Sequence, residues 1–435
     1  MRASILAILC FPGTIVAQIA INGPMPGHID LTEATIWLQC QGLCSEQIEF
    51  WPTSDRSKAR TTEPITSDPR RGHCMDIVLP DLLPGTEYTY RLIGSAGSGT
   101  DEQLFSFRTQ PIWKFRTDPP EFTMAMGSCA YINEPAFDRP GNPYGGGYGI
   151  FDAIADKKPD LMLWLGDNIY LREPDWGSRS GYLHRYTSTR STPELQRLLQ
   201  STKHYAIWDD HDFGPNDADG SFVNSALARE MFDLFWPNPT NGVPSVEGIT
   251  TAFSHADVDF FLIDDRTFRI PGDMKTATPQ LFGKAQLDWL VQALKYSDAP
   301  FKLVAVGSQV LNTGAVYENF STMPAERTEL LRRIEEEGVT GVVFLTGDRH
   351  YTELSSLELR DGRAIYDLTV SPLTSGSYSP KETNTLRVEG TVVDQRNFGT
   401  LTFSGKQGER LMTIRIFTAD GELVWERGIP QEEQD

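Results

Sequence analysis

The sequence lacks features that define several common classes of protein. After the first twenty residues, no apolar run is long enough to form a membrane-spanning helix. Basic residues are scarce: 39 Lys and Arg stand against 59 Asp and Glu, a formal net charge of −20 at pH 7. A protein that coats nucleic acid needs a basic stripe, so this balance argues against that class. There is also no internal repeat and no low-complexity segment.

The length of 435 residues exceeds the usual size of a single hydrophobic core, so we expect two domains. An acidic surface is compatible with a phosphate-ester substrate, provided that metal ions or local Arg and Lys side chains reverse the potential inside the binding pocket. The sequence gives no indication of oligomeric state.

Residues 1–17 have the pattern of a secretory signal peptide. Met1 and Arg2 precede a short apolar stretch, and Ala17 supplies a small residue at a cleavage point. The stretch is too short, and too broken by Pro12-Gly13, to span a bilayer. A buried N-terminal strand is the alternative interpretation. The signal pattern predicts a secreted or periplasmic/extracellular protein.

Five cysteines are present, of which Cys10 would leave with the signal peptide. Cys40, Cys44 and Cys74 predict one disulfide in an oxidising compartment, joining Cys74 to Cys40 or Cys44. Cys129 stands far from them in the chain. Because an unpaired cysteine in an exported protein is usually oxidised, disulfide-bonded or metal-bound, a thiolate–metal bond is one interpretation of Cys129. A buried apolar thiol is the other.

Residues 18–110 alternate apolar and polar side chains between Pro and Gly turns, which is typical of a small β-sandwich. The predicted strands cover residues 35–38, 48–51, 75–79, 88–92 and 103–107. The stretch Leu82 to Tyr88 resembles the strand-entry corner of fibronectin type III and related domains, in which a Tyr hydroxyl bonds to the backbone of the corner. We therefore expect an Ig/fibronectin III-like N-terminal domain.

A polar connector at residues 116–120 precedes a region in which strands alternate with helices. The predicted helices cover residues 150–155, 181–199, 226–235, 284–294 and 325–337. The predicted strands cover 122–126, 161–165, 204–208, 302–306 and 341–345, with a hairpin at 251–264 and further hairpins from 354 to 427. We expect residues 120–435 to form one large α/β or α+β domain, with a pair of mixed sheets flanked by helices.

Four of these strands lead into loops with acidic or metal-binding side chains. Because loops beyond strand C-termini converge at one edge of an α/β sheet, the four loops predict a single site. They are Gly127-Ser128-Cys129, Gly166-Asp167-Asn168-Ile169-Tyr170, Trp208-Asp209-Asp210-His211-Asp212 and Gly347-Asp348-Arg349-His350.

The side chains in two of these loops are spaced for a shared ligand. Two residues separate Asp167 from Tyr170, so a tight loop can direct a carboxylate and a phenolate to one point. Asp348 and His350 share a face of an extended segment. Phenolate, carboxylate and imidazole suit a divalent or trivalent transition metal. An Asp that caps a turn beside a core Tyr is the structural alternative for the first pair.

The candidate site carries more negative charge than side chains alone can neutralise. Its potential anions cannot lie together without cations; they are Cys129, Asp167, Tyr170, Asp210 and Asp348. One Fe³⁺ on the Cys, Tyr and His side, with one or more divalent ions on the oxygen-only side, would balance this charge, and Ca²⁺ is compatible with such oxygen ligands.

Two basic side chains extend the candidate site. His211 lies in an acidic run, where carboxylates are expected to raise the imidazole pKa and favour its protonated form. A protonated His can donate to a leaving oxygen. Arg349 either binds substrate phosphate bidentately or neutralises nearby acids. A nucleophilic Ser mechanism is disfavoured, because Ser128 has no adjacent base.

The order of the four motifs resembles that of the alkaline phosphatase D (PhoD-type) branch of the calcineurin-like metallophosphoesterases. The resemblance covers residues 120–435, and the preceding β-sandwich is similar to that family's N-terminal domain. Against the superfamily signatures D-x-H, G-D, G-N-H-E and G-H-x-H, Cys129 replaces the first motif, Asp210 stands at the Asn, and Asp348 stands at the first His of the last motif. These replacements are those of the D-type branch. Purple acid phosphatases share G-D-x-x-Y, but the missing D-x-H and G-H-x-H argue against that branch.

The resemblance implies a four-layer metallophosphoesterase-type α/β (α+β) sandwich with two metal sites. Iron would be held by Cys129, Asp167, Tyr170 and His350. Asp167 would bridge to a divalent ion held by Asp210 and Asp348. Many relatives supply a further His after the strand at 302–306, where this chain has Gly307-Ser308-Gln309. Asn216 and Asp217 are candidates for the missing ligands.

The function that the resemblance implies is the hydrolysis of phosphomonoesters and/or phosphodiesters by metal-bound hydroxide, with His211 protonating the leaving group or steadying the transition state. A phosphodiesterase of phospholipase D-like specificity is the alternative within enzymes. A degenerate surface-binding protein is the alternative from another class, although intact acids and His at every expected strand end argue against it. Loops 131–148 and 374–388 would shape the mouth of the site.

Overall fold

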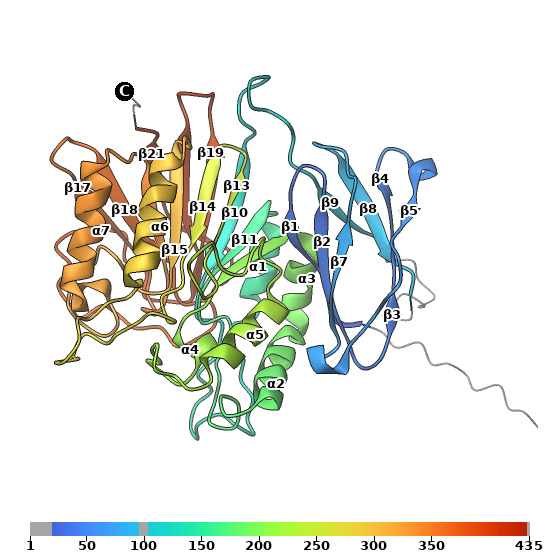
Figure 1. Ribbon diagram of the computed structural model, residues 1–435, viewed down its shortest axis with the longest axis horizontal. Coiled ribbons are helices and arrows are strands. Elements are labelled where there is room, and N and C mark those ends of the chain that lie inside the picture. The colour runs from blue at the N-terminus through green and yellow to red at the C-terminus, as the bar shows by residue number, and fades with distance from the viewer. Residues whose placement is uncertain (1–19, 95–102, 433–435) are drawn as a thin grey trace, which may run out of the picture.

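The computed structural model describes residues 20–94 and 103–432 (Figure 1). The predicted signal peptide, residues 1–17, lies outside the described residues, and so does Cys10. Within the described ranges, no helix has the length and apolar character needed to cross a membrane.

The N-terminal part of the chain forms β-sheets around a core of its own. A three-stranded sheet has the order β1-β2-β7, a four-stranded sheet has the order β5-β4-β8-β9, and β3 pairs with β6. All five predicted strands are present, whereas β1 was not predicted. The elements are β1 (Ala20–Ile29), β2 (Ala34–Cys40), β3 (Ser45–Glu46), β4 (Ile48–Pro52), η1 (Arg56–Lys58), β5 (Arg60–Thr61), β6 (Ile65–Thr66), η2 (Pro69–Arg71), β7 (Cys74–Leu79), β8 (Glu87–Leu92) and β9 (Phe105–Arg108).

The corner before β8 contains the expected bond between a Tyr hydroxyl and the backbone. The backbone N–H of Leu83 donates to Oη of Tyr88 at 2.8 Å. The Tyr88 ring is buried and stacks on Phe107, with ring centroids 5.6 Å apart. The hydroxyl therefore satisfies a backbone donor at the edge of the core, while the ring packs inside it.

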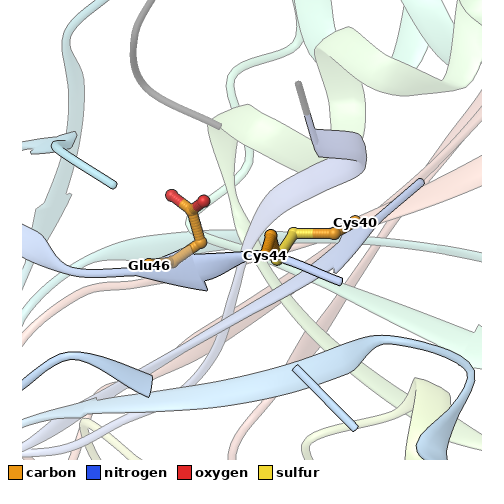
Figure 2. A group of neighbouring side chains, drawn as sticks. All are labelled: Cys40, Cys44 and Glu46. Carbon is orange, nitrogen blue, oxygen red and sulfur yellow. A yellow bond between two sulfur atoms is a disulfide. The ribbon is translucent and has the colours of Figure 1, made fainter. Parts of the chain in front are cut away.

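One disulfide is present among the three N-terminal cysteines, but the predicted partner is wrong. The bond joins Cys40 to Cys44 (Figure 2), and Cys74 is a buried free thiol. In the β2–β7 ladder Cys74 lies opposite Gln39, so the two share a face of the sheet. Cys40 is the next residue along β2 and points to the other face. Strand alternation thus places Cys40 in the core of the N-terminal sheets and Cys74 in the core that they share with the later strands and helices.

The rest of the chain forms two six-stranded mixed sheets, as predicted. The first has the order β12-β11-β10-β19-β20-β21, and the second has the order β13-β14-β15-β16-β18-β17. The strands are β10 (Phe122–Gly127), β11 (Leu161–Leu165), β12 (Lys203–Ile207), β13 (Thr251–His255), β14 (Val258–Leu262), β15 (Phe301–Val306), β16 (Val342–Thr346), β17 (Glu353–Glu358), β18 (Ala364–Thr369), β19 (Asn397–Ser404), β20 (Leu411–Thr418) and β21 (Leu423–Pro430).

The helices match the predicted ones within a few residues, except that the region 181–199 is divided. Pro193 begins a new helix there, because proline lacks a backbone N–H and is accepted in the first turn but not in a helix interior. The helices are α1 (Ile150–Asp156), α2 (Arg179–Arg190), α3 (Pro193–Ser201), α4 (Asp210–Phe213), α5 (Ser225–Phe235), α6 (Gly283–Tyr296), η3 (Phe320–Thr322) and α7 (Pro324–Glu336).

The two sheets pack on each other through a shared core. In the second sheet, Phe261, Val304 and Phe344 pack in a core with α6 and α7, which cover this sheet in Figure 1. Their neighbours Phe260, Leu303 and Leu345 belong to the core that contains the strands of the first sheet. Because successive side chains of a strand point to opposite faces, the second sheet lies between α6 and α7 on one side and the first sheet on the other.

The parallel strands place their carboxyl ends together. Strands β10, β11 and β12 run parallel in the first sheet, as do β14, β15, β16 and β18 in the second. The ends of the two sheets meet: a Cβ added at Gly347, after β16, would lie 2.4 Å from the carbonyl oxygen of Leu165, at the end of β11. Loops from both sheets therefore share one edge of the fold.

Candidate metal centre at the strand ends

The loops after β10 and β11 are joined through their backbones. The N–H of Cys129 donates to the carbonyl of Gly166 at 3.3 Å, and the N–H of Ala130 donates to the carbonyl of Asp167 at 2.9 Å. Gly166 has a φ of 88°, and a Cβ there would lie 2.7 Å from Cβ of Asp209. Only glycine fits this position, and it brings the loops after β11 and β12 into contact.

The residues that were predicted to hold iron lie together. Donor atoms of Cys129, Asp167 and His350 all lie within 4.8 Å of one another. The sulfur of Cys129 is 3.5 Å from Oδ2 of Asp167. The Tyr170 hydroxyl is 3.1 Å from the same oxygen and 3.3 Å from Nε2 of His350. One thiol, one carboxylate, one phenol and one imidazole therefore point to a single place.

A second group of donors adjoins the first through Asp167. Donor atoms of Asp167, Asp210 and His211 lie within 4.8 Å of one another. The backbone N–H of His211 donates to Oδ1 of Asp210 at 2.9 Å and to Oδ1 of Asp167 at 3.3 Å. Asp167 thus directs one oxygen to each group, which is the arrangement of a carboxylate that bridges two sites.

Asp348 and Arg349 lie beside these two groups. Asp348 belongs to none of the donor groups found among residues 20–94 and 103–432. The sulfur of Cys129 nevertheless lies 3.7 Å from the backbone carbonyl oxygen of Asp348, so Asp348 lies at the edge of the same site. The guanidinium of Arg349 is 3.9 Å from the Asp348 carboxylate and 3.1 Å from that of Glu382. Of its two predicted roles, this geometry fits neutralisation of nearby acids.

Four of the candidate ligands have left-handed backbone conformations. The φ angles are 60° at Cys129, 51° at Asp167, 62° at Asp348 and 55° at His350. A side chain with a Cβ adopts this region rarely and at a cost of about 1–2 kcal/mol. Such strain persists where the surrounding structure enforces it, and it concentrates at functional sites.

Burial makes Cys129, Asp167 and Asp348 poor anions without a cation. Asp210 differs: burial opposes its charged form, but the charges of His211 and Arg266 outweigh burial and lower its pKa to about 2. Burial, followed by repulsion from Asp210, raises the pKa of Asp167 well above its usual value. Burial raises the pKa of Asp348 to about 7 and that of the Cys129 thiol well above its usual value. No Lys, Arg or His forms an ion pair with Asp167 or Asp210 in the part of the chain that the structure describes. These donors therefore suit a metal ion, which would stabilise their charged forms.

The expected rise in the His211 pKa is wrong. Burial lowers the pKa of His211, and this outweighs the opposite effect of Asp210. The imidazole packs on the Tyr170 ring with centroids 4.3 Å apart, and its Nδ1 is buried without a hydrogen-bond partner. Burial also lowers the pKa of His350, to about 4, so its ring is neutral and has a lone pair free for a metal.

Asp209 and Asp212 hold the loop rather than enter either donor group with Asp167. Asp209 caps the short helix α4 and accepts from the N–H of Asp210 at 3.0 Å. Asp212 accepts from the N–H of Asn168 at 3.1 Å and from the N–H of Asp209 at 3.1 Å. Asp212 therefore connects the loop that carries Asp167 to the loop that carries Asp210.

A buried charge network behind the site was missed from the sequence. The guanidinium of Arg266 binds the Asp209 carboxylate and donates to both oxygens of Glu318, at 3.0 and 2.9 Å. Donor atoms of Asp209, Asp210 and Glu318 form a third close group. The run Asp264-Asp265-Arg266 follows β14 as the other motifs follow their strands, so it was a usable signal. Glu318 lies in a loop with no such signal.

The loop after β15, where the resemblance implies a further His, begins at Gly307. A Cβ there would lie 2.5 Å from Cγ of Asp209 and 2.6 Å from Oδ2 of Asp265, so no side chain fits. Gln309, two residues on, donates to Glu353 at 2.9 Å and to Thr369 at 2.7 Å. It is therefore engaged in a separate polar cluster.

Of the two suggested substitute ligands, Asp217 is the nearer to the site. Its backbone N–H donates to Oδ2 of Asp210 at 2.6 Å. Burial raises the pKa of its carboxyl, and so do the charges of Glu318 and Asp210. Asn216 is exposed, and no hydrogen bond of its side chain is found among the described residues.

A further group of donor side chains, Cys40, Cys44 and Glu46, lies in the N-terminal part (Figure 2). Because the two sulfurs are bonded to each other, they are not thiolate ligands. This group is therefore not a metal site in the oxidised protein.

A pocket of ≈ 380 Å³ opens beside the candidate metal centre. Asp348, Arg349 and His350 form its inner wall. The remaining lining residues are Tyr317, Tyr351, Tyr378, Ser379, Pro380, Lys381 and Glu382. The pocket thus contains part of the predicted mouth loop 374–388.

The fold and the site agree with what sequence comparison finds. The family model for PhoD-like phosphatases matches residues 124–416, which include all four motifs. The chain therefore belongs to the PhoD-like phosphatase family, and the family predicted from the motifs is confirmed. Alkaline phosphatase D of Bacillus subtilis (strain 168) is 23% identical over 347 residues, a match that covers 67% of this chain and only 55% of that protein.

Solved structures share the fold at low sequence identity. A structure of PhoD has a TM-score of 0.76 and 17% identity, covering 97% of this chain and 94% of that one. A purple acid phosphatase, PPD1 from yellow lupin (Lupinus luteus) seeds, has a TM-score of 0.66 and 12% identity, covering 94% and 74%. The mixed α/β architecture is therefore common to both.

Proposed function

We propose that this chain is an exported, metal-dependent phosphoesterase that hydrolyses phosphomonoesters and/or phosphodiesters at the strand-end site. The observation that carries the proposal is the position of Asp167, which belongs to the Cys129 and His350 group and also to the Asp210 and His211 group. A carboxylate shared by two adjacent donor groups suits a pair of metal ions, which is a common template for phosphoryl transfer.

The chemistry of the donors suits two different ions. Thiol, phenol and imidazole donors favour a transition metal, so Fe³⁺ would be held by Cys129, Asp167, Tyr170 and His350. The oxygen donors on the other side suit a hard divalent ion such as Ca²⁺, held by Asp167, Asp210 and Asp348. When bound, such ions polarise a phosphoryl oxygen and lower the pKa of water.

The chain's own residues would bind and orient the ester. His211 belongs to the Asp167 and Asp210 group and packs on the Tyr170 ring, and an imidazole in this position can donate a hydrogen bond to the departing oxygen. Arg349 lies in the wall of the adjoining pocket beside Asp348 and Glu382, and its charge reduces the repulsion that these acids exert on an anionic substrate.

A phosphodiesterase of phospholipase D-like specificity is the second candidate. The observation that favours it is the ≈ 380 Å³ pocket that begins at Asp348 and His350. A monoester needs room for one organic group only, whereas a diester needs a second space beside the phosphorus.

The N-terminal part and the signal pattern complete the proposal. The bond from Leu83 to Tyr88 and the packing of two sheets support an Ig/fibronectin III-like domain. The disulfide between Cys40 and Cys44 fits an oxidising compartment and thus supports export.

Metal analysis combined with an ester assay tests the proposal. Purified protein should contain iron and a divalent ion, and it should hydrolyse a phosphomonoester, a phosphodiester or both. In Asp167→Asn, both metal contents should fall and kcat/KM should drop about 10²-fold or more. Asp273→Asn, at an exposed site, is the control and should behave as the unmodified protein. Protein that contains neither ion, or an Asp167→Asn variant with full activity, contradicts the proposal.

A further inference from the structure

We infer that the pocket beside Asp348 and His350 is a subsite for a planar aromatic group of the phosphate ester. The inference rests on the proposed function for the site, and it adds the class of organic substituent. Two tyrosines, Tyr317 and Tyr378, line the pocket and are 73% and 56% exposed. Large aromatic rings exposed together in a hollow next to a reactive centre are typical of a ligand site.

The Tyr378 ring is fixed in place before any ligand binds. Its backbone N–H donates to the carbonyl of His350 at 3.0 Å. Its ring stacks on the His350 imidazole with centroids 5.4 Å apart and an angle of 15° between the planes. Its hydroxyl is 3.3 Å from that of Tyr144, which also contacts His350. One ring face is thus covered by a candidate iron ligand, and the exposed remainder faces solvent.

Tyr317 is held in place by Arg349 and by the turn in which it lies. The Arg349 guanidinium lies over its ring, 4.3 Å from the centroid. Its backbone has a φ of 51°, a conformation that non-glycine residues adopt rarely. The turn around it is closed by bonds from Asn319 to the carbonyls of Val316 and Gly314, at 3.2 and 2.9 Å. The chain therefore holds an exposed aromatic ring in a strained turn. Such strain is concentrated at functional sites, and exposing the ring to solvent gives no energy to offset it.

The aromatic lining of the pocket favours an arene over an alkyl chain. Its volume of ≈ 380 Å³ exceeds the roughly 150 Å³ cavity that holds a benzene ring. Arg349 is paired with Glu382, whereas Lys381, also in the lining, forms no ion pair among the described residues. Tyrosine rings present flat π surfaces on which planar groups stack. Any nucleobase or arene has a π face and can stack in this way. A phenyl ester and a nucleoside ester share this chemistry.

Binding of non-hydrolysable phosphonates tests the subsite without requiring turnover. In the metal-loaded protein, calorimetry would compare phenylphosphonate with cyclohexylphosphonate, which has a ring of the same atom count that is not planar. We expect phenylphosphonate to bind about fivefold more tightly. In Tyr317→Leu and Tyr378→Leu this ratio should fall toward one. Tyr296→Leu, at a tyrosine that is 90% exposed and outside the pocket lining, is the matched control and should keep the ratio.

Equal affinities in the unmodified protein, or an unchanged ratio in both pocket variants, overturn the subsite. Iron content is measured for Tyr378→Leu, because Tyr378 stacks on His350, and the Tyr317→Leu result stands independently of that contact. The phosphonomethyl analogue of adenosine 5′-phosphate distinguishes the two arenes: tighter binding than phenylphosphonate supports a nucleobase, and weaker binding supports a small arene. Selective phosphonate binding without hydrolysis of any ester would overturn the proposed function alone.

Discussion

The sulfur of Cys129 lies 3.5 Å from Oδ2 of Asp167, although the two residues are 38 positions apart in the chain. The two residues follow β10 and β11, which are parallel neighbours, so their loops begin at the same edge of one sheet. Both groups are buried, and burial favours their uncharged forms. This contact therefore has a stable charged state only with a cation between or beside the two groups.

Removing the Tyr170 hydroxyl should abolish a visible absorption band of the iron-loaded protein. If Tyr170 binds Fe³⁺, the protein has a visible charge-transfer band, and Tyr170→Phe should lose it. The absorption spectrum and the iron content, measured on the same sample, check this. Tyr186→Phe is a suitable control, since its hydroxyl is also buried and has no partner among the described residues. A band that persists in Tyr170→Phe would show that another residue produces it.

Loss of the His211 side chain should slow turnover. We expect His211→Ala to lower kcat by about 10² or more, as is typical when a group that assists the leaving oxygen is lost. KM should change less, because this contact strengthens in the transition state. His184→Ala provides the control: His184 pairs with Glu134 at 2.6 Å and lies in none of the donor groups. Unchanged turnover would remove His211 from the mechanism.

A methyl group at position 307 should disturb the site from behind. In Gly307→Ala the new Cβ would lie 2.5 Å from Cγ of Asp209, so the Asp209 carboxylate must shift. Overpacking of this kind costs about 1–3 kcal/mol of unfolding free energy, and we expect a larger proportional loss in kcat/KM because Asp209 caps the helix that carries Asp210. Thermal melting and ester hydrolysis measure both effects. At Gly177 a Cβ has open space, so Gly177→Ala should change neither.

Asp367 should make stability depend on pH. Burial raises its pKa to about 6, although it accepts bonds from the backbone N–H groups of Val310 and Leu311. The folded state then holds more protons than the unfolded state between about pH 4 and 6, so the unfolding free energy falls as pH rises through that window. Asp367→Asn does not titrate. In urea unfolding, the unfolding free energy of the unmodified protein should fall relative to that of Asp367→Asn by up to about 3 kcal/mol from pH 4 to pH 7.

Urea unfolding of Asp273→Asn over the same pH range controls for general effects of charge. Asp273 is exposed, so this variant should keep the pH slope of the unmodified protein. A pH slope that persists in Asp367→Asn would instead come from other acids, such as the half-buried Asp233, whose pKa burial also raises to about 6.

The thiols offer a check on the corrected disulfide. Cys74 and Cys129 are buried and free, so both should resist alkylation in the native state and react after denaturation without reductant. Peptide mapping should then find Cys40 linked to Cys44. Recovery of a peptide that links Cys74 to either residue would contradict the observed pairing.

By itself the sequence determined the order of the elements, the family and the motif residues that meet at the strand ends. These are local properties: strand and helix patterns repeat over a few residues, and acids after a strand can be recognised wherever they stand. The sequence pointed to these residues because each lies in a loop just after a predicted strand, and such loops meet at one edge of a sheet: Cys129, Asp167, Tyr170, Asp210 and His350.

Only the tertiary structure decided what depends on distance and burial between segments far apart. It paired Cys40 with Cys44, because the face of a strand on which a side chain lies depends on register. It reversed the expected shift of the His211 pKa, because desolvation outweighs a neighbouring charge once the ring is buried. It also paired Arg266 with Glu318, 52 positions away, behind Asp209. It placed the Arg349 guanidinium over the Tyr317 ring. No regular spacing in the sequence predicts either contact.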